Sequence, residues 1–241
     1  MSNYPPQFNA GAYNTGYAPA FTMRISQVMK RVYVNMTLAL LVTALVSLFC
    51  ANPASGYLAF MARNSWMMWV LIIAQFGIVI GVNAGINRLS TATATLLFYA
   101  FAVIMGMWLS PILIIYTGAS IAKTFFITSG TFAAMSVYGY CTNRDLTKFG
   151  NILFMALIGL IIASLVNIFL KSDGLGWIIS IFGVLIFVGL TAWDTQQIKK
   201  MAQLAPADSI GRLAVLGALS LYLDFINLFL YLLRFFGASR D

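Results

Sequence analysis

The chain has 241 residues, of which 61% are hydrophobic and 8% are charged, and its formal net charge is +8. Soluble domains carry roughly 25% charged residues, so a mean hydropathy of +0.89 excludes an ordinary soluble fold and indicates an integral membrane protein. The basic balance of such a protein reflects Lys and Arg gathered in cytoplasmic loops, and we therefore expect the lipid bilayer and no nucleic acid as its partner.

Residues 1–23 are rich in Asn, Tyr, Pro and Gly and carry no charged side chain, which predicts a disordered N-terminal tail. From residue 24 on, sparse charges divide the chain into apolar runs about as long as the roughly 20 residues that a bilayer requires. These runs should be helices, because a backbone exposed to lipid must satisfy its own hydrogen bonds. The predicted fold is an all-α polytopic membrane protein with one domain, residues 24–241. It has seven transmembrane helices: 32–52, 66–86, 93–115, 120–140, 150–170, 175–198 and 213–236.

The orientation follows from the distribution of Lys and Arg. With a cytoplasmic N-terminus and an outside C-terminus, nine of them lie inside and five outside, which agrees with the positive-inside rule. The inside set comprises Arg24, Lys30, Arg31, Arg88, Arg144, Lys148, Lys199, Lys200 and Arg212. The outside set comprises Arg63, Lys123, Lys171, Arg234 and Arg240.

Small residues recur at the spacing of helix packing in the fifth and sixth spans. They are Gly159 with Ala163, and Gly176 with Ser180 and Gly183. Close approach of neighbouring helices is the ordinary explanation of such rows, and we prefer it to a ligand cleft.

All six acidic residues are aspartates, and two of them lie inside predicted spans. Asp224 is roughly 16 Å from the start of the seventh span, and Asp194 is roughly 7–8 Å inside the edge that Lys199 marks. The other four lie in loops or at the terminus. An ionised carboxylate within the membrane costs several kcal/mol unless it is hydrated, paired or hydrogen-bonded.

Asp224 belongs to a stripe of small and polar residues that follow one another at steps of three and four along the seventh span. Such a stripe faces the bundle interior or water. Polar contact between helices is the structural alternative, but it needs only an Asn or a Ser, so the central Asp favours a functional site. The stripe comprises Gly217, Ser220, Asp224, Asn227, Tyr231 and Arg234.

Two carboxyl groups that approach each other in a low dielectric cannot both ionise cheaply. We therefore expect Asp194 and Asp224 to share a proton and to titrate as one unit near physiological pH. Arg88, at the inner end of the second span, is a candidate latch that pairs with Asp194 and holds the helices together. Arg88 can equally be an ordinary basic residue that anchors the cytoplasmic end of its helix, as the positive-inside rule describes.

The motifs "VGLTAWDTQQIKKM" and "GALSLYLDFINLFLYLLRFFG", which contain the two aspartates, resemble the signature of the Bax inhibitor family. The stretches "LSPILIIYTGASIAKTFFITSGTFAAMSVYGYCTNRDLTKFG" and "GNILFMALIGLIIASLVNIFLKS" resemble its bacterial branch. The resemblance covers roughly residues 25–237. It implies that the last helix is central and surrounded by the other six.

The resemblance also implies a pH-sensitive calcium leak in a bacterial inner membrane, with Asp194 and Asp224 as pH sensor and Arg88 as latch. Calcium is the transported ion, and no cofactor is expected. Ser220, Asn227 and Tyr231 would then line the pore, and the two aspartates would offer calcium a weak transit site.

Two other functions are alternatives to a leak. Intramembrane aspartyl proteases also place one Asp on each of two late helices, but their second Asp follows Gly-x-Gly, whereas Asp224 follows "LYL". The chain has no histidine either, which excludes His-dependent triads and His-ligated metals, so we expect no enzyme. The second alternative, which the resemblance allows, is a non-conducting regulator that binds a membrane-bound ATP-dependent protease.

Overall fold

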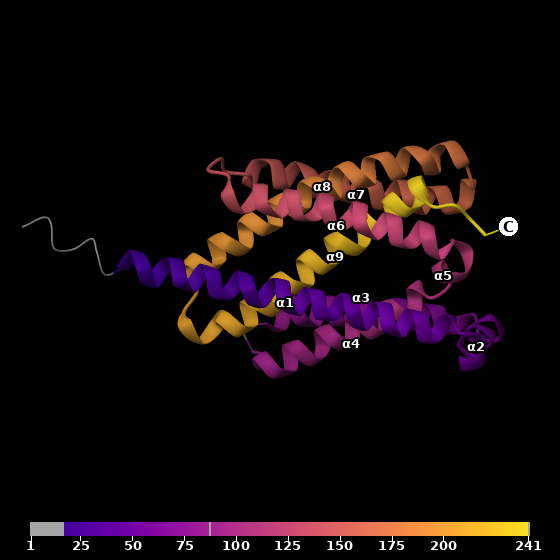
Figure 1. Cartoon of the computed structure of the whole chain (residues 1–241), viewed down its shortest axis with the longest axis horizontal. Helices are drawn as coiled ribbons and strands as arrows, with labels where there is room; N and C mark the ends of the chain where they lie inside the picture. Colours follow the sequence, from indigo (N-terminus) through magenta and orange to yellow (C-terminus); the bar gives the residue numbers. More distant parts are fainter. Residues whose placement is uncertain (1–16, 87, 241) are drawn as a thin grey trace, which may run out of the picture.

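The structure, a computed structural model, describes residues 17–86 and 88–240, without the side chains of residues 17–22 and 207. The described chain is all-helical, as predicted, and most of its long helices run roughly along the long axis of the molecule, while α9 crosses them obliquely (Figure 1). The helix α1 begins at one end of this bundle, here called the N-terminal end, and α9 finishes at the other, the C-terminal end. The elements are α1 (Tyr17–Ala51), η1 (Pro53–Ser55), α2 (Tyr57–Arg63), α3 (Trp66–Gly85), α4 (Thr91–Leu109), α5 (Ile112–Ile115), α6 (Gly118–Cys141), α7 (Thr147–Leu170), α8 (Asp173–Leu204), η2 (Ala207–Ser209) and α9 (Ile210–Phe236).

Each predicted span corresponds to a long helix whose ends are set by local chemistry. Three helices begin after a hydroxyl residue whose side chain accepts a hydrogen bond from the third helical N–H: Ser90 before α4, Thr117 before α6 and Ser172 before α8. The predicted tail differs, since α1 already includes residues 17–23, while residues 1–16 lie outside the described chain.

Six of the described helices are long and apolar enough to cross a membrane: residues 23–51, 66–85, 91–115, 147–170, 173–204 and 210–236. The remaining long helix, α6, has 24 residues but contains many Ser and Thr residues and Lys123, so it is not among these six candidates. Six of the seven predicted spans therefore meet the criteria of length and composition.

The helix α9 packs against α1, α4, α6 and α8, and it is the most buried of the six candidate spans. Two of its aromatic residues mark the faces that contact α4 and α6. Tyr222 makes edge-to-face contacts with Phe98 and Phe101 of α4, and Phe225 makes similar contacts with Phe125 and Phe132 of α6. A third face is left for α8. By contrast, α3 packs mainly on α4, and α7 mainly on α8.

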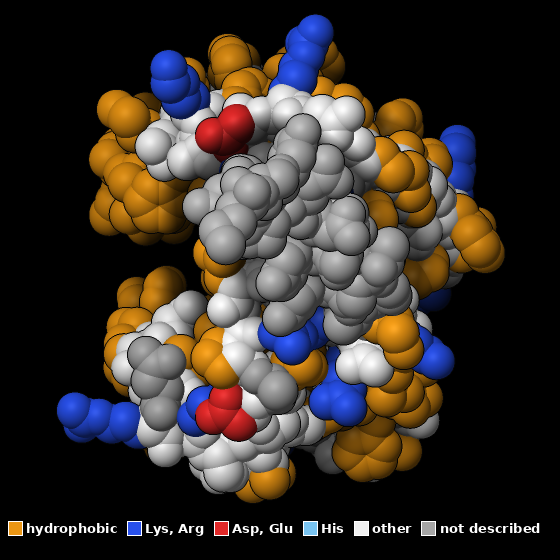
Figure 2. Space-filling model, turned by 90° about the vertical axis from the view of Figure 1, so that its left-hand side faces the viewer, with side chains coloured by type: hydrophobic (Ala, Val, Ile, Leu, Met, Phe, Trp, Pro, Cys, Tyr) orange, Lys and Arg blue, Asp and Glu red, His pale blue; other side chains and the backbone are white. Residues whose placement is uncertain are grey.

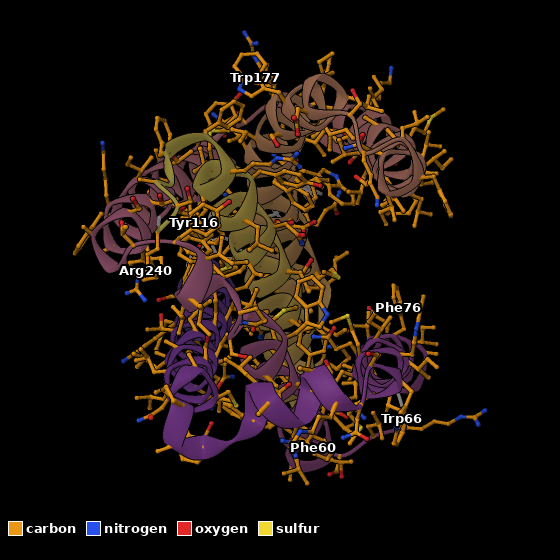
Figure 3. The ribbon with its side chains drawn as sticks, turned by 90° about the vertical axis from the view of Figure 1, so that its right-hand side faces the viewer. Phe60, Trp66, Phe76, Tyr116, Trp177 and Arg240 are labelled. Atoms are coloured by element: carbon orange, nitrogen blue, oxygen red, sulfur yellow. The ribbon has the colours of Figure 1, made fainter. Side chains whose placement is uncertain are left out.

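The two ends of the bundle differ in chemistry. Lys and Arg side chains stand around the N-terminal end (Figure 2). At the C-terminal end, the exposed Trp66 and Trp177 lie on the rim, as is typical of residues at a membrane interface (Figure 3). There the segment after α9 returns to the α5–α6 connection, where Thr117 N donates to Ala238 O at 3.1 Å and Arg240 N donates to Ile115 O at 2.8 Å.

Candidate functional site

The two predicted aspartates meet between α8 and α9. Their carboxyl groups lie within hydrogen-bonding reach of each other, and Ser220 of α9 donates its hydroxyl to Asp194 Oδ2. Asp224 is 5% exposed, and its Oδ2 atom is buried and has no hydrogen-bond partner among the described residues. Asp194 is partly buried. The structure therefore brings together two acids that are 30 positions apart in the sequence.

The backbone around Asp194 is held by close approach of two further helices. On α6, Gly139 lies so near Ala192 that a Cβ at position 139 would run into the Ala192 backbone. On α7, Gly150 lies directly beside the Trp193 indole, which a Cβ would also strike. Three consecutive residues of α8 thus face α6, α7 and α9 in turn, and the carboxyl group of Asp194 points toward α9.

The loop between α6 and α7 is fastened to α8 two residues beyond Asp194. Gln196 donates from Nε2 to Arg144 O at 2.8 Å, and it accepts at Oε1 from Leu146 N at 2.9 Å. Lys200 forms an ion pair with Asp145 at 2.5 Å. Hydrogen bonds from Lys200 and Thr147 lower the pKa of Asp145 to about 2, so this exposed acid stays ionised at physiological pH.

Two further residues of the polar stripe lie against α8, whereas the periodicity predicted only that the stripe faces the bundle interior or water. Tyr231 stacks on Phe187 with ring centroids 5.9 Å apart, and it covers Gly183. Arg234 lies against Gly176, while Asn227 donates to Leu223 O of its own helix at 2.8 Å. The row of small residues on α8 therefore admits the large side chains of the α9 stripe.

Arg88 is placed apart from the pair. It is exposed in the connection between α3 and α4. Among the described residues, no hydrogen bond or ion pair joins Arg88 to Asp194 or Asp224. Its role as a latch stays a prediction.

The oxygen atoms at the pair suit a hard cation only loosely. The two carboxylates and the Ser220 hydroxyl offer five oxygens, whereas calcium takes six to eight. Within the described ranges, no third Asp, Glu, His or Cys joins the two aspartates to complete a metal site. A cation would therefore keep part of its hydration shell here.

Sequence reasoning did not identify the residues that fix Asp194. Gly139, Gly150 and Gln196 lie within the stretches that resemble the family, but nothing in those stretches assigned them a role. The available signal was the glycine in each neighbouring span, because a glycine at a helix contact marks close backbone approach.

A comparison with protein-family models matches residues 25–241 to the family described as "Inhibitor of apoptosis-promoting Bax1". The chain is 50% identical over 215 residues to "Inner membrane protein YbhL" of Escherichia coli K12, covering 88% of this chain and 92% of the relative. It is 46% identical over 222 residues to protein RP147 of Rickettsia prowazekii, covering 92% and 93%. Membrane protein SpyM3_0260 of Streptococcus pyogenes is 35% identical over 215 residues, covering 89% and 94%.

These matches confirm the resemblance that the sequence motifs indicate. Together with the six candidate spans, the likeness to an inner membrane protein confirms the prediction of a multi-pass protein of the bacterial inner membrane.

Proposed function

Because the chain belongs to the Bax inhibitor-1 family, we propose that it is a pH-sensitive calcium leak in which Asp194 and Asp224 form the proton sensor. One observation carries the proposal: two carboxyl groups from different membrane-spanning helices lie in contact, and one oxygen of the pair is buried without a partner. The stability of this contact between the two carboxyl groups depends on the number of protons that the pair holds.

The pair holds at least one proton when it is hydrogen-bonded, since an ionised carboxylate has no hydrogen to donate. If that proton leaves, two like charges about 4 Å apart repel by about 4 kcal/mol at an effective dielectric constant of 20. Separation of α8 and α9, entry of water or binding of a cation relieves this repulsion. Each of these three changes would make the passage of an ion between the helices depend on whether the pair holds its proton.

Calcium is the cation we assign to this path, as a substrate that passes a weak site. Asp194, Asp224 and Ser220 supply the oxygens, and Asn227 and Tyr231 continue the polar face of α9 toward the C-terminal end. Incomplete coordination favours release of the ion over tight binding. Arg88 enters the proposal as the group that pairs with Asp194 when the leak is closed.

The topology that we assign has seven spans, with α6 as the additional one and α9 in the centre. At about 1.5 Å per residue, the 24 residues of α6 reach about 36 Å, longer than the hydrocarbon core of about 30 Å. The described termini lie at opposite ends of the bundle, which supports an odd number of passages (Figure 1). The Lys and Arg residues around the N-terminal end support a cytoplasmic N-terminus (Figure 2).

The test uses the purified full chain in liposomes loaded with a calcium dye, with external pH varied. Flux is expected to change between about pH 6 and 8, and Asp194→Asn or Asp224→Asn should remove most of that dependence. Asp145→Asn is the matched control, because it makes the same chemical change outside the membrane at an acid whose pKa is about 2.

A flat pH profile in the unmodified protein contradicts the sensor, and absence of calcium flux at every pH contradicts the leak. In the second case, co-purification of a membrane-bound ATP-dependent protease would identify the protein as a regulator. Cleavage of helical substrates that disappears in Asp224→Asn would instead identify a protease.

A further inference from the structure

A groove separates α1 from α6 on the side of the bundle away from α3 and α7. Both helices pack on α8 and α9, and between them remains a groove of about 770 Å³ whose floor includes Phe225. A smaller cavity of about 220 Å³ continues it toward the C-terminal end. The two share four lining residues: Leu40, Ala44, Phe125 and Phe225.

The groove is most polar at one end and mainly apolar along the rest of its length, where Thr37, Ser129 and Ser136 are the polar exceptions. At the N-terminal end, Lys30, Tyr33 and Tyr140 line it, together with Ser26. Farther along, the walls are mostly aliphatic and aromatic, and the smaller cavity is lined almost wholly by apolar side chains. Lys30 is exposed, so its ammonium group is available to a ligand at the mouth.

The groove is longer than the hydrocarbon thickness of one leaflet of a bilayer. From Lys30 to Ala44 the groove follows α1 for 14 residues, or about 21 Å, whereas half of the hydrocarbon core is about 15 Å. Lys30 precedes Ala51, the last residue of its candidate span, by 21 residues, or about 32 Å, which places it near the headgroups. The apolar part of the groove then lies at the depth of acyl chains.

From this gradient we infer that the groove is a binding site for an anionic phospholipid, with the phosphate at Lys30 and one acyl chain along Ala44, Phe125 and Ala133. Charge complementarity selects this occupant, because the charged side chain in the lining, Lys30, lies at the headgroup end and the remainder of the lining is mainly apolar and uncharged. Basic side chains around the same end of the bundle add to the attraction (Figure 2). The site is separate from the aspartate pair, and it does not depend on calcium conduction.

The experiment places the full chain in nanodiscs with a photoactivatable phosphatidylglycerol that carries a diazirine on its acyl chain. Mass spectrometry then locates the attached lipid. We expect attachment to concentrate on residues 37–48 and 121–137. Ala133→Phe fills the groove and should lower the yield at least fivefold. Ala156→Phe is the control, because Ala156 is exposed on α7 and far from the groove.

The headgroup is tested by comparing phosphatidylglycerol with an otherwise identical phosphatidylcholine. Lys30→Gln should remove a preference of about fivefold for the anionic lipid. Arg31→Gln makes the same change one residue along α1, does not line the groove, and should keep the preference. Ala44→Phe, on the opposite wall, replaces Ala133→Phe if thermal unfolding shows that the latter is misfolded.

Several results would overturn the assignment. Labelling spread evenly over α3 and α7, equal labelling by the two lipids, or equal effects of the Lys30 and Arg31 changes would each do so. Cross-links through Cys141 to a second copy, or from residues 1–22 into the groove, in place of lipid attachment would assign the groove to protein.

Discussion

The contact between α8 and α9 that aligns the aspartate pair requires glycine at position 183. A Cβ built on Gly183 would lie 2.7 Å from three atoms of the Tyr231 ring, whereas carbon atoms in contact are separated by about 3.5–4.0 Å. Gly183→Ala must therefore open the contact by about 1 Å. The ring cannot simply turn aside, because it stacks on Phe187 at 5.9 Å.

Inserting one methyl group into such a packed contact costs about 1–3 kcal/mol. For a chain of this size, each kcal/mol lowers Tm by about 2–4 °C, so Gly183→Ala should unfold about 2–12 °C below the unmodified protein. The measurement is thermal unfolding of the purified protein by circular dichroism in one fixed detergent.

Gly159→Ala is the matched control. No atom lies within 4 Å of a Cβ at Gly159 on α7, and alanine favours a helix by about 1 kcal/mol over glycine. This variant should therefore unfold at the same temperature or slightly higher. Adding Tyr231→Leu to Gly183→Ala should recover part of the loss, which a double-mutant cycle measures. Equal Tm values for the two glycine variants would refute the reasoning.

Three further predictions concern charge and hydrogen bonding. If Arg88 is a latch, Arg88→Gln should raise calcium flux at pH 8 and shift the pH midpoint of the flux by about one unit, or about 1.4 kcal/mol. The same change at Arg63 should do neither. Unchanged flux in Arg88→Gln would show that Arg88 only anchors its helix end on the cytoplasmic side. The Lys200–Asp145 pair should contribute its full stabilisation above the ordinary Asp pKa of 3.8, and this stabilisation should disappear as pH falls through about 2. The unfolding temperature of Asp145→Asn should therefore differ from that of the unmodified protein at pH 5 but not below pH 2. Tyr222→Phe removes the hydroxyl that lies 2.7 Å from Thr43 Oγ1 and should cost about 1 kcal/mol in thermal unfolding; an unchanged Tm would show that this buried hydrogen bond adds nothing.

Much of the helical framework could be predicted, because charges are so sparse that they mark the ends of apolar runs. The third helix of the structure, Trp66–Gly85, coincides with its predicted span to within one residue. The first predicted span, 32–52, began too late, because α1 spans Tyr17–Ala51. Residues 17–23 carry no apolar periodicity, and Arg24, Lys30 and Arg31 marked the start of the first apolar run. The short α2 was missed as well, because η1 and α2 lie in the connection between two spans.

The aspartate pair could be anticipated for a geometric reason. Depth along two antiparallel helices places Asp194 in the cytoplasmic half of the bilayer and Asp224 deeper, near the midplane, which permits a contact between them. The period of the stripe orients Asp224 inward. Depth and period say nothing of the rotation of a third helix. The sequence therefore predicts that Arg88 and Asp194 lie toward the same side of the membrane, but it does not predict the distance between them.

The sequence predicted the two rows of small residues, but it did not predict which helix packs on each row. The row from Gly176 to Gly183 packs on α9, while Gly159 of the other row faces open space. Both rows look alike in sequence, because spacing identifies a flat helix face and not the helix that covers it.

The position of α9 has a consequence for biosynthesis. A ribosome releases the chain from its N-terminus, so α9, on which α1, α4, α6 and α8 all pack, leaves after the other described helices. Until then Phe98 and Phe132 lack the rings that cover them, and Asp194 faces an unfilled side of the bundle. A premature stop codon near residue 210 would thus abolish the shared packing partner of four earlier helices, and the truncated product should be degraded rather than accumulate.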